Sequence, residues 1–334
     1  KLLAGQIVRK KDVIFLSPGK GIPVSEASKW IGKRLLRTKK KFEHISANDF
    51  KSIIMPGEWK KFAFKKKWGL KCRFHDYHLF KMLDLPIVEY HLSDKDLDQQ
   101  VTVANPKSEL YVHAPEIINN ELFDLCSIHP EIAVRSIDIL KRTIKKTLQL
   151  DIGFKQEGKP KLIVHPGGMS ANTESYDTKK LMRIAEKSFS EVVCRRVEVL
   201  VENLPPRPWY LGGQWFQLAF MRANEILEFC DAFDFGIALD ICHAYLYCRY
   251  FQEDLNSYIR TLLPRIRHIH ICDATGFDGE GLQIGEGEIN FDNVFAVLEG
   301  NDFSWVPEIW NGHLDGGAGF HVALQRLGRF ANYL

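Results

Sequence analysis

The sequence predicts an α/β fold in residues 68–334, preceded by a short segment of different composition. Apolar runs rich in Val, Ile and Leu recur along this part of the chain, and such runs are typical of buried parallel strands. Amphipathic stretches with apolar residues at helical spacing separate most of them, for instance 133–150 and 178–193. Eight strand–helix units in about 265 residues match the size of a TIM (β/α)8 barrel.

Each expected strand is a short apolar run, and most end in an imidazole or a carboxylate. The catalytic groups of a TIM barrel sit at the carboxyl ends of its strands, so these end residues are the candidate site. We expect the strands at 69–74, 86–92, 109–115, 161–168, 198–205, 235–243, 267–273 and 303–310. The polar groups at their ends are His113, His165, Glu202, Asp240, His243, His270 and Glu308.

Four of these groups predict a metal site. A charged side chain at the end of a buried strand is costly unless something pairs with it, and a metal ion is an efficient partner. Taken singly, such a residue is more often a hydrogen-bonded structural group, so the prediction depends on the set. Carboxylates with one imidazole suit Mn²⁺, Zn²⁺ or Mg²⁺. The four expected ligands are Glu202, Asp240, His270 and Glu308.

Charge marks a boundary near 60–67. Residues 1–67 carry 18 Lys and Arg against 5 Asp and Glu, a net charge of +13. Residues 68–334 carry 27 Lys and Arg against 37 Asp and Glu, a net charge of −10. The basic charges are not interleaved with stacking aromatics, which favours a solvated face or an anionic partner over nucleic acid. The acidic remainder argues against a phosphate backbone as its ligand. We expect a domain at 1–55, a linker at 56–67 and the barrel at 68–334.

The segment 1–55 is dense in turn residues, with short apolar runs such as 13–16 between them. Its one helical candidate is 25–35, with Ser25 as the cap.

The composition predicts a cytoplasmic protein. No apolar stretch approaches 18 residues and nothing at the start resembles a signal peptide, which predicts a soluble protein without a membrane partner. The 7 cysteines are scattered and include no CxxC pair. Disulfides are therefore not expected.

The stretches AGQIVRKKDV, SPGKGIP, IGKRL and EHISANDF lie within the first 55 residues. They resemble the SAF (antifreeze-like) domain that ends sialic acid synthases. The resemblance implies a small β-rich domain, and it points to amino-sugar or sialic-acid-like polysaccharide biosynthesis. Phe42 departs from the pattern, because the family has a turn glycine there. We expect either a piece of a longer synthase fusion or a structural remnant.

The motifs VHAP, VHPGG, VEN, LDxCH, HIxxxD, IGEGEINF and PEIW follow in order from residue 112 to residue 310. They resemble the xylose isomerase-like barrel superfamily, which holds sugar isomerases and epimerases and the endonuclease IV type of abasic-site nuclease. The resemblance implies that Glu202, Asp240, His270 and Glu308 form the metal site that the isomerases share.

Three histidines have alternative roles under this resemblance. His113 and His165 match nuclease-type ligands of a second metal that shares Glu202, and His243 matches a ligand of a third. In isomerases this layer binds sugar hydroxyls instead. The third site lacks two ligands, because Gly279 and Gly281 stand where an Asp and a His are expected. Two roles are open for Glu89: it helps to bind substrate, or it lies beneath the cluster and completes it there. The loop 205–216 offers Arg207 and Trp209 to cover a sugar.

We therefore predict a metal-dependent sugar isomerase or epimerase that acts through an enediolate, with Glu202 and Glu308 as acid and base. His113, His165, His243, Arg207 and Trp209 are the predicted substrate-binding residues. The alternatives are an endonuclease IV-like metal-dependent hydrolase and a non-catalytic sugar-binding module. The predicted partner is a small sugar or sugar derivative rather than nucleic acid, with a homo-oligomer or association with a synthase domain as further options.

Overall fold

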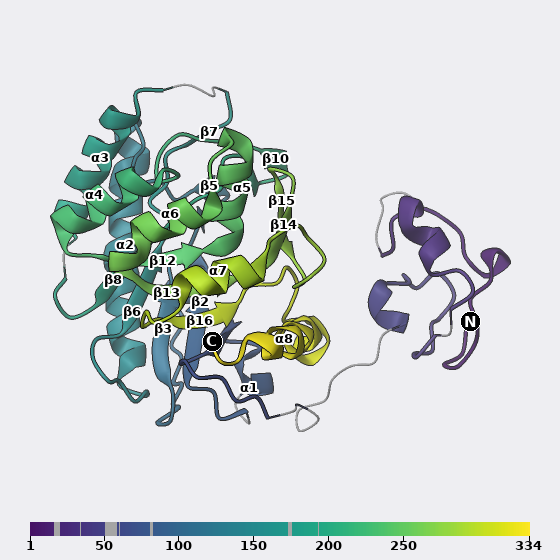
Figure 1. Cartoon of the computed structure of the whole chain (residues 1–334). Helices are drawn as coiled ribbons and strands as arrows, with labels where there is room; N and C mark the ends of the chain where they lie inside the picture. The colour runs from purple at the N-terminus through teal and green to yellow at the C-terminus, as the bar shows by residue number, and fades with distance from the viewer. Residues whose placement is uncertain are drawn as a thin grey trace. The chain divides into compact units, whose positions relative to one another are not determined.

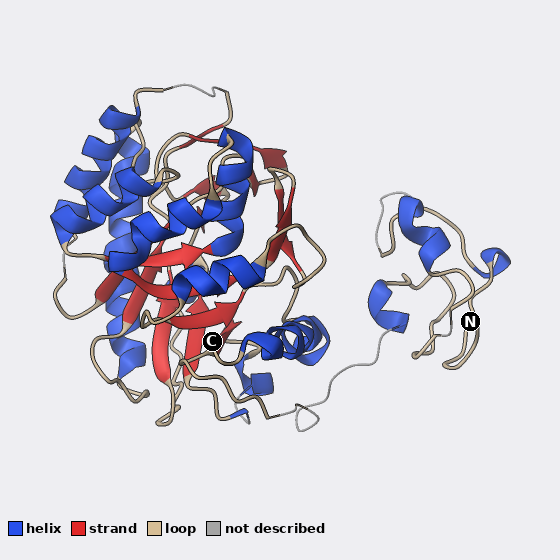
Figure 2. Ribbon diagram, in the orientation of Figure 1, coloured by secondary structure: helices blue, strands red, loops and turns tan. Residues whose placement is uncertain are grey.

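The computed structural model describes residues 1–16, 21–33, 35–50, 59, 61–80, 83–172, 176–192 and 194–334. The chain forms two compact units, one made mainly of Lys1–Trp59 and one of Lys60–His313 with Gly319–Leu334. Figure 1 traces the chain from the N-terminus to the C-terminus, and Figure 2 separates its helices from its strands. Each unit is described by itself.

The larger unit is built on a sheet of eight parallel strands in the order β1-β2-β3-β6-β8-β12-β13-β16. The ends of the sheet approach each other, because Trp68 forms a parallel bridge with Trp305 and the Trp305 amide donates to the carbonyl of Lys67 at 3.0 Å. The predicted TIM-barrel architecture is confirmed. The strands are β1 Gly69–Cys72, β2 Ile87–His91, β3 Glu109–His113, β6 Lys161–Val164, β8 Glu198–Glu202, β12 Gly236–Asp240, β13 Ile266–Ile271 and β16 Ser304–Pro307.

Helices cover the outside of this sheet (Figure 2). The longest, Pro130–Asp151, begins with a proline at a position that needs no amide hydrogen, and it buries one apolar face. No helix within the described ranges is long and apolar enough to cross a membrane. The helices are α1 Tyr77–Phe80, α2 Pro130–Asp151, α3 Thr178–Ser190, α4 Ala223–Phe233, α5 Ile241–Phe251, α6 Leu255–Leu262, α7 Phe291–Leu298 and α8 Leu314–Leu327.

The side-chain alternation of the strands explains how the polar groups come together. One cluster of buried side chains comes from five neighbouring strands: Ile87, Tyr111, Ile163, Leu200 and Ala238. Successive side chains of a strand point to opposite faces, so the residue two positions later faces the same way. That rule places a second layer directly above this apolar one. Its members are Glu89, His113, His165, Glu202 and Asp240.

Four short antiparallel pairs interrupt the connections that follow the strands. The segment 205–216, which was expected to be a plain loop, contains paired strands, and so does the stretch near Gly279. The pairs are β4 Ile117–Ile118 with β5 Glu121–Leu122, β7 Met169–Ser170 with β11 Phe216–Gln217, β9 Trp209–Tyr210 with β10 Gly213–Gln214, and β14 Asp273–Thr275 with β15 Gly279–Leu282.

The smaller unit is held by backbone pairing and short helices. Leu2 pairs with Lys39, and the amide of Val8 donates to the carbonyl of Lys33 at 2.9 Å. No strand is assigned among its described residues, so the β-rich character expected for 1–55 is limited there to this pairing. Phe42 has a φ of 64°, a left-handed conformation that suits the glycine expected from the resemblance. The helices are 3-10 turns at Lys10–Asp12, Val24–Lys29 and Ala47–Phe50.

One local prediction for this unit was wrong. The expected helix at 25–35 is a 3-10 helix over Val24–Lys29 whose N-cap is Pro23, so Ser25 lies inside it. Gly32, with a φ of 90°, lies just beyond its end, where the chain turns back to pair with Val8. The apolar run 13–16 forms no strand, and its Ile14 is 63% exposed.

We predict that Gly69→Ala destabilises the barrel. A Cβ at Gly69 would lie 2.2 Å from the carbonyl oxygen of Ile87, and backbone cannot move aside as a side chain can. Overpacking of this kind costs about 1–3 kcal/mol. Urea unfolding checks the loss. The control is Gly158→Ala, where an added Cβ meets nothing within 4 Å. Equal stability of the two variants would contradict the close approach.

Candidate active site

Four ligand-type side chains converge at the carboxyl ends of β8, β12, β13 and β16. Glu202, Asp240, His270 and Glu308 each offer an atom within 4.8 Å of the others. Glu202, Asp240 and His270 are at most 2% exposed, whereas the Glu308 side chain is 18% exposed and lies on the open side. The structure thus brings together the four residues that the sequence predicts as ligands.

His270 has its two ring nitrogens turned to different carboxylates. Its Nε2 lies 3.3 Å from Glu89, while its Nδ1 lies 2.7 Å from Oε2 of Glu308 and 3.3 Å from Oε1 of Glu202. If Nε2 donates to Glu89, Nδ1 presents a lone pair to the two other carboxylates. A carboxylate behind a ligating imidazole is the usual arrangement in metal sites, where it fixes the tautomer.

Glu89 is buried completely and binds three imidazoles. His91 Nε2 lies 2.6 Å away and His268 Nε2 lies 2.8 Å away, in addition to His270. Although burial would raise it, the pKa of Glu89 is held well below its usual value by His270 and His268. Of the two roles left open for Glu89, this geometry favours the one beneath the cluster rather than contact with substrate.

Glu202 belongs to a second group of ligand-type atoms. His113 Nε2 and His165 Nε2 each lie 3.2 Å from its Oε2. His113 Nδ1 lies 2.9 Å from the Ala114 carbonyl, so both ring nitrogens face acceptors, and a neutral His113 can donate to only one of them. Although burial would lower it, Glu202 and Glu116 raise the pKa of His165 to about 9.

His243 approaches both Glu202 and a carboxylate that the sequence analysis missed. Its Nδ1 lies 3.0 Å from the Asn203 carbonyl, and its Nε2 lies 3.7 Å from Glu280. Glu280 stands between Gly279 and Gly281, the two glycines taken as lost ligands, so this corner of the site does contain a carboxylate. Burial raises the pKa of Glu280 to about 7.

The indole of Trp310 explains why position 281 carries no side chain. A Cβ at Gly281 would lie 2.2 Å from Cδ1 of Trp310, and Gly281 has a φ of 71°. The Trp310 amide donates to the Gly281 carbonyl at 2.9 Å, which holds the two segments together. Trp310 is 57% exposed.

Three further polar residues belong to the cluster, and two of them, Lys71 and Glu116, were not assigned a role from the sequence. Lys71 at the end of β1 forms an ion pair with Oε1 of Glu308. Tyr210 donates to Glu116 at 2.9 Å and lies 3.5 Å from His165 Nδ1. Although burial would raise it, His165, His113 and Lys71 lower the pKa of Glu116 to about 2. For Lys71 the signal was present, because it is a charged residue near the end of an apolar strand.

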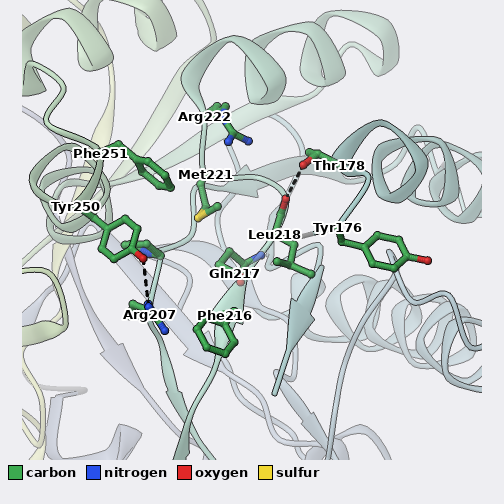
Figure 3. A pocket seen from close by; sticks show the side chains of 11 residues that line it. Tyr176, Thr178, Arg207, Phe216, Gln217, Leu218, Met221, Arg222, Tyr250 and Phe251 are labelled. Atoms are coloured by element: carbon green, nitrogen blue, oxygen red, sulfur yellow. Dashed lines mark hydrogen bonds between the residues drawn. The ribbon is translucent and has the colours of Figure 1, made fainter. Parts of the chain in front are cut away.

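The predicted substrate-binding residues Arg207 and Trp209 come from the segment that follows β8. Arg207 donates to the hydroxyl of Tyr250 at 3.2 Å, and both residues line a cavity that none of the four expected ligands lines (Figure 3). Trp209 is 48% exposed on β9. The side chain that the 205–216 segment sends to the cluster is that of Tyr210.

The charges of the cluster fit a divalent cation. Although burial would raise it, His270 and His165 hold the pKa of Glu202 well below its usual value, whereas burial raises the pKa of Asp240 to about 6. Oε2 of Glu308 is buried and accepts no hydrogen bond from the described residues. A second proton on the imidazole of His270, or a metal ion bound between the two residues, would satisfy this oxygen.

The family described as the xylose isomerase-like TIM barrel matches residues 79–327. The chain belongs to this family. The match lies within the larger unit, so the resemblance of residues 1–55 to the SAF domain stays a prediction.

The relatives and structural neighbours of the chain are distant in sequence. A probable endonuclease 4 of Aquifex aeolicus is 24% identical over 212 residues, which cover 60% of this chain and 69% of that protein. A D-tagatose 3-epimerase-like protein matches with a TM-score of 0.54 and 19% identity, over 78% of this chain and 97% of that one. A D-psicose 3-epimerase from Clostridium cellulolyticum H10 matches with a TM-score of 0.52 and 15% identity, over 79% of this chain and 99% of that one. These two structural matches establish the fold alone.

We predict that divalent cations stabilise the chelator-treated protein, and more so at pH 7.5 than at pH 5. The raised pKa of Asp240 means that its carboxyl ionises in the fold only near pH 6, and His270 must lose a proton to bind a metal. Without a cation, the stability contributed by protonated Asp240 is lost as the pH rises from about 4 through 6. A cation at about 100 times its Kd should add roughly 2.7 kcal/mol.

Thermal unfolding with Mn²⁺, Zn²⁺ or Mg²⁺ measures this effect. Asp240→Asn should remove most of the stabilisation, whereas Asp138→Asn on the exposed side of α2 should retain it. An unchanged unfolding temperature with all three ions would refute the metal site.

Proposed function

We propose that the chain is a metal-dependent sugar isomerase or epimerase that acts through an enediolate. The observation that carries the proposal is the pair Glu202 and Glu308, two carboxylates that approach the same imidazole nitrogen from β8 and β16. A reaction that removes a proton at one place on a sugar and returns it at another needs two such groups. The epimerases among the structural neighbours support the same class.

The residues divide into metal holders and proton carriers. Glu202, Asp240, His270 and Glu308 would hold a divalent ion, which when bound supplies a positive charge that polarises the carbonyl of the sugar. One of the two glutamates then removes the proton from the carbon next to the carbonyl. The other delivers a proton to the opposite face or to the neighbouring carbon. The ion pair with Lys71 holds the carboxylate of Glu308 in one orientation.

Imidazoles and a phenol line the same place. We propose that His113, His165 and His243 bind hydroxyls of the sugar, as does Tyr210, because a buried hydrogen-bonding site rejects a substrate that lacks the matching group. Trp209, on the same short strand as Tyr210, is proposed as part of the cover. The substrate is a sugar or sugar derivative, for which the amino-sugar or sialic-acid-like context of residues 1–55 remains the proposal.

A metal-dependent hydrolase of the endonuclease IV type is the second candidate. The group His113, His165 and Glu202 favours it, because a second ion sharing Glu202 would suit phosphodiester hydrolysis. The relative named as a probable endonuclease 4 points the same way. Metal content separates the two: one ion per chain supports the isomerase, and two or three support the hydrolase.

We predict that Glu202→Gln and Glu308→Gln each lower turnover by at least about 100-fold while the fold stays intact. An amide neither carries the proton nor ligates as well as a carboxylate. The assay follows deuterium uptake from D₂O beside the carbonyl, over a panel of ketoses and aldoses, by NMR. Glu186→Gln on the exposed face of α3 is the matched control. Retention of most turnover by either variant, with metal bound, would end the proton-carrier assignment.

Incision of duplex DNA at an abasic site is predicted to be negligible. Residues 68–334 carry 27 basic against 37 acidic side chains, which repel a phosphate backbone. A gel assay with endonuclease IV as the positive control measures it. Robust nicking by the protein that disappears in both Glu202→Gln and His113→Asn would instead promote the hydrolase.

A further inference from the structure

Two buried cysteines lie next to Asp240, one of the four expected ligands. Asp240 of β12 pairs in register with His270 of β13, and the residues two positions further along the two segments are Cys242 and Cys272. Their thiols are hydrogen-bonded to each other, and both residues are at most 2% exposed. We refer to Cys242 and Cys272 as the thiol pair.

The surroundings of Cys242 differ from those of other buried cysteines. The thiols of Cys126 and Cys230 each donate to a backbone carbonyl. The sulfur of Cys242 instead accepts from the amide of Gly281, in addition to its bond with Cys272. Cys242 also lies in the first turn of α5, a helix of 11 residues. An amide donor and the start of a helix both favour the thiolate, which is the form of cysteine that ligates a metal.

Asp240 completes a set of three ligand-type atoms. One oxygen of Asp240 and the two sulfurs of the thiol pair all lie within 4.8 Å of one another. Two sulfurs bound to one zinc ion at about 2.3 Å lie about 3.8 Å apart in a tetrahedral site, so this spacing is compatible with one shared ion. Three protein ligands with the fourth position open is a usual zinc arrangement.

The thiol pair is neutral until a cation binds. Burial outweighs the amide and the helix start, because it raises the pKa of Cys242 to about 11. The hydrogen bond to Cys242 raises the pKa of Cys272 well above its usual value. A thiophilic cation displaces the two protons when it binds. It reaches the pair from the mouth of the barrel, where the side chain of Glu280, which directly precedes Gly281, is 14% exposed.

We propose that Asp240, Cys242 and Cys272 form a site for one thiophilic divalent cation, such as Zn²⁺ or Cd²⁺. Sulfur ligands select such ions, whereas the oxygen and nitrogen ligands of the proposed isomerase reaction suit Mn²⁺ or Mg²⁺ as well. The new site shares only Asp240 with the four expected ligands. Its existence does not depend on the proposed reaction.

Cadmium tests the proposal, added at one ion per chain to the full-length protein after chelator treatment. A phosphine reductant keeps the thiols reduced. Bound Cd²⁺ should give thiolate-to-cadmium charge-transfer absorption in the ultraviolet, and X-ray absorption should show two sulfur neighbours. Cys242→Ser and Cys272→Ser should each lower the number of sulfur neighbours. Each should also weaken Cd²⁺ binding by more than the roughly 10–100-fold that loss of a ligand's hydrogen-bond partner costs.

Three variants serve as controls. Cys248→Ser changes a buried cysteine on the same helix, and Cys194→Ser changes one that is not buried. Both should keep two sulfur neighbours and the parent's affinity. Glu308→Gln removes one of the four expected ligands but none of this site, and it should keep the sulfur neighbours. Failure of the proposed reaction and failure of this site are therefore distinguishable.

Thermal unfolding without a cation confirms that each variant is folded, and Cys242→Ala or Cys272→Ala replaces a serine variant that is not. Any of three results overturns the proposal. The parent binds no Cd²⁺, or binds it without a sulfur neighbour. Either folded variant of the thiol pair keeps two sulfur neighbours. The sulfur neighbours disappear in Glu308→Gln, which would place the ion among the four expected ligands.

Discussion

Neutralising buried carboxylates is the constraint on which the rest of this barrel depends. Glu89 has no exposed surface and Glu202 is 1% exposed, yet both are held in the ionised form by imidazoles. An isolated ionised carboxylate at such depth would cost far more than any one hydrogen bond returns. Two of the histidines have a defined partner on both sides of the ring: His268 joins Glu89 to Ser304, and His270 joins Glu89 to Glu202 and Glu308.

The barrel and the ligand cluster could be predicted from sequence because both follow from strand periodicity. Leu200 is core and Glu202 is site for the same reason that Ala238 is core and Asp240 is site: residues two apart share a face. Nothing beyond the eight apolar runs and their end residues is needed for that inference. The same reasoning, applied to 69–74, would have found Lys71.

What the sequence could not predict is carried by chain segments that pair with each other. Tyr210 reaches Glu116 because β9 and β10 form a hairpin, and Gln214 of that hairpin donates to Asp278, between β14 and β15, at 3.1 Å. Glu280 is turned toward His243 by that second hairpin. Short pairings of two residues have no periodic signal, so neither contact is visible in composition or spacing. The hydrogen bond of Arg207 to Tyr250, at the far end of α5, has no periodic signal either.

The indole of Trp310 and a side chain at position 281 would compete for the same space at the barrel mouth. A Cβ at Gly281 would lie 2.2 Å from the indole, so both can be present only if the indole or the backbone moves. Trp310 is 57% exposed, and Glu280 lies 3.7 Å from His243, so this part of the rim combines an aromatic ring with a carboxylate. The room left at position 281 therefore decides whether an aromatic ring or a further polar side chain borders whatever the mouth admits.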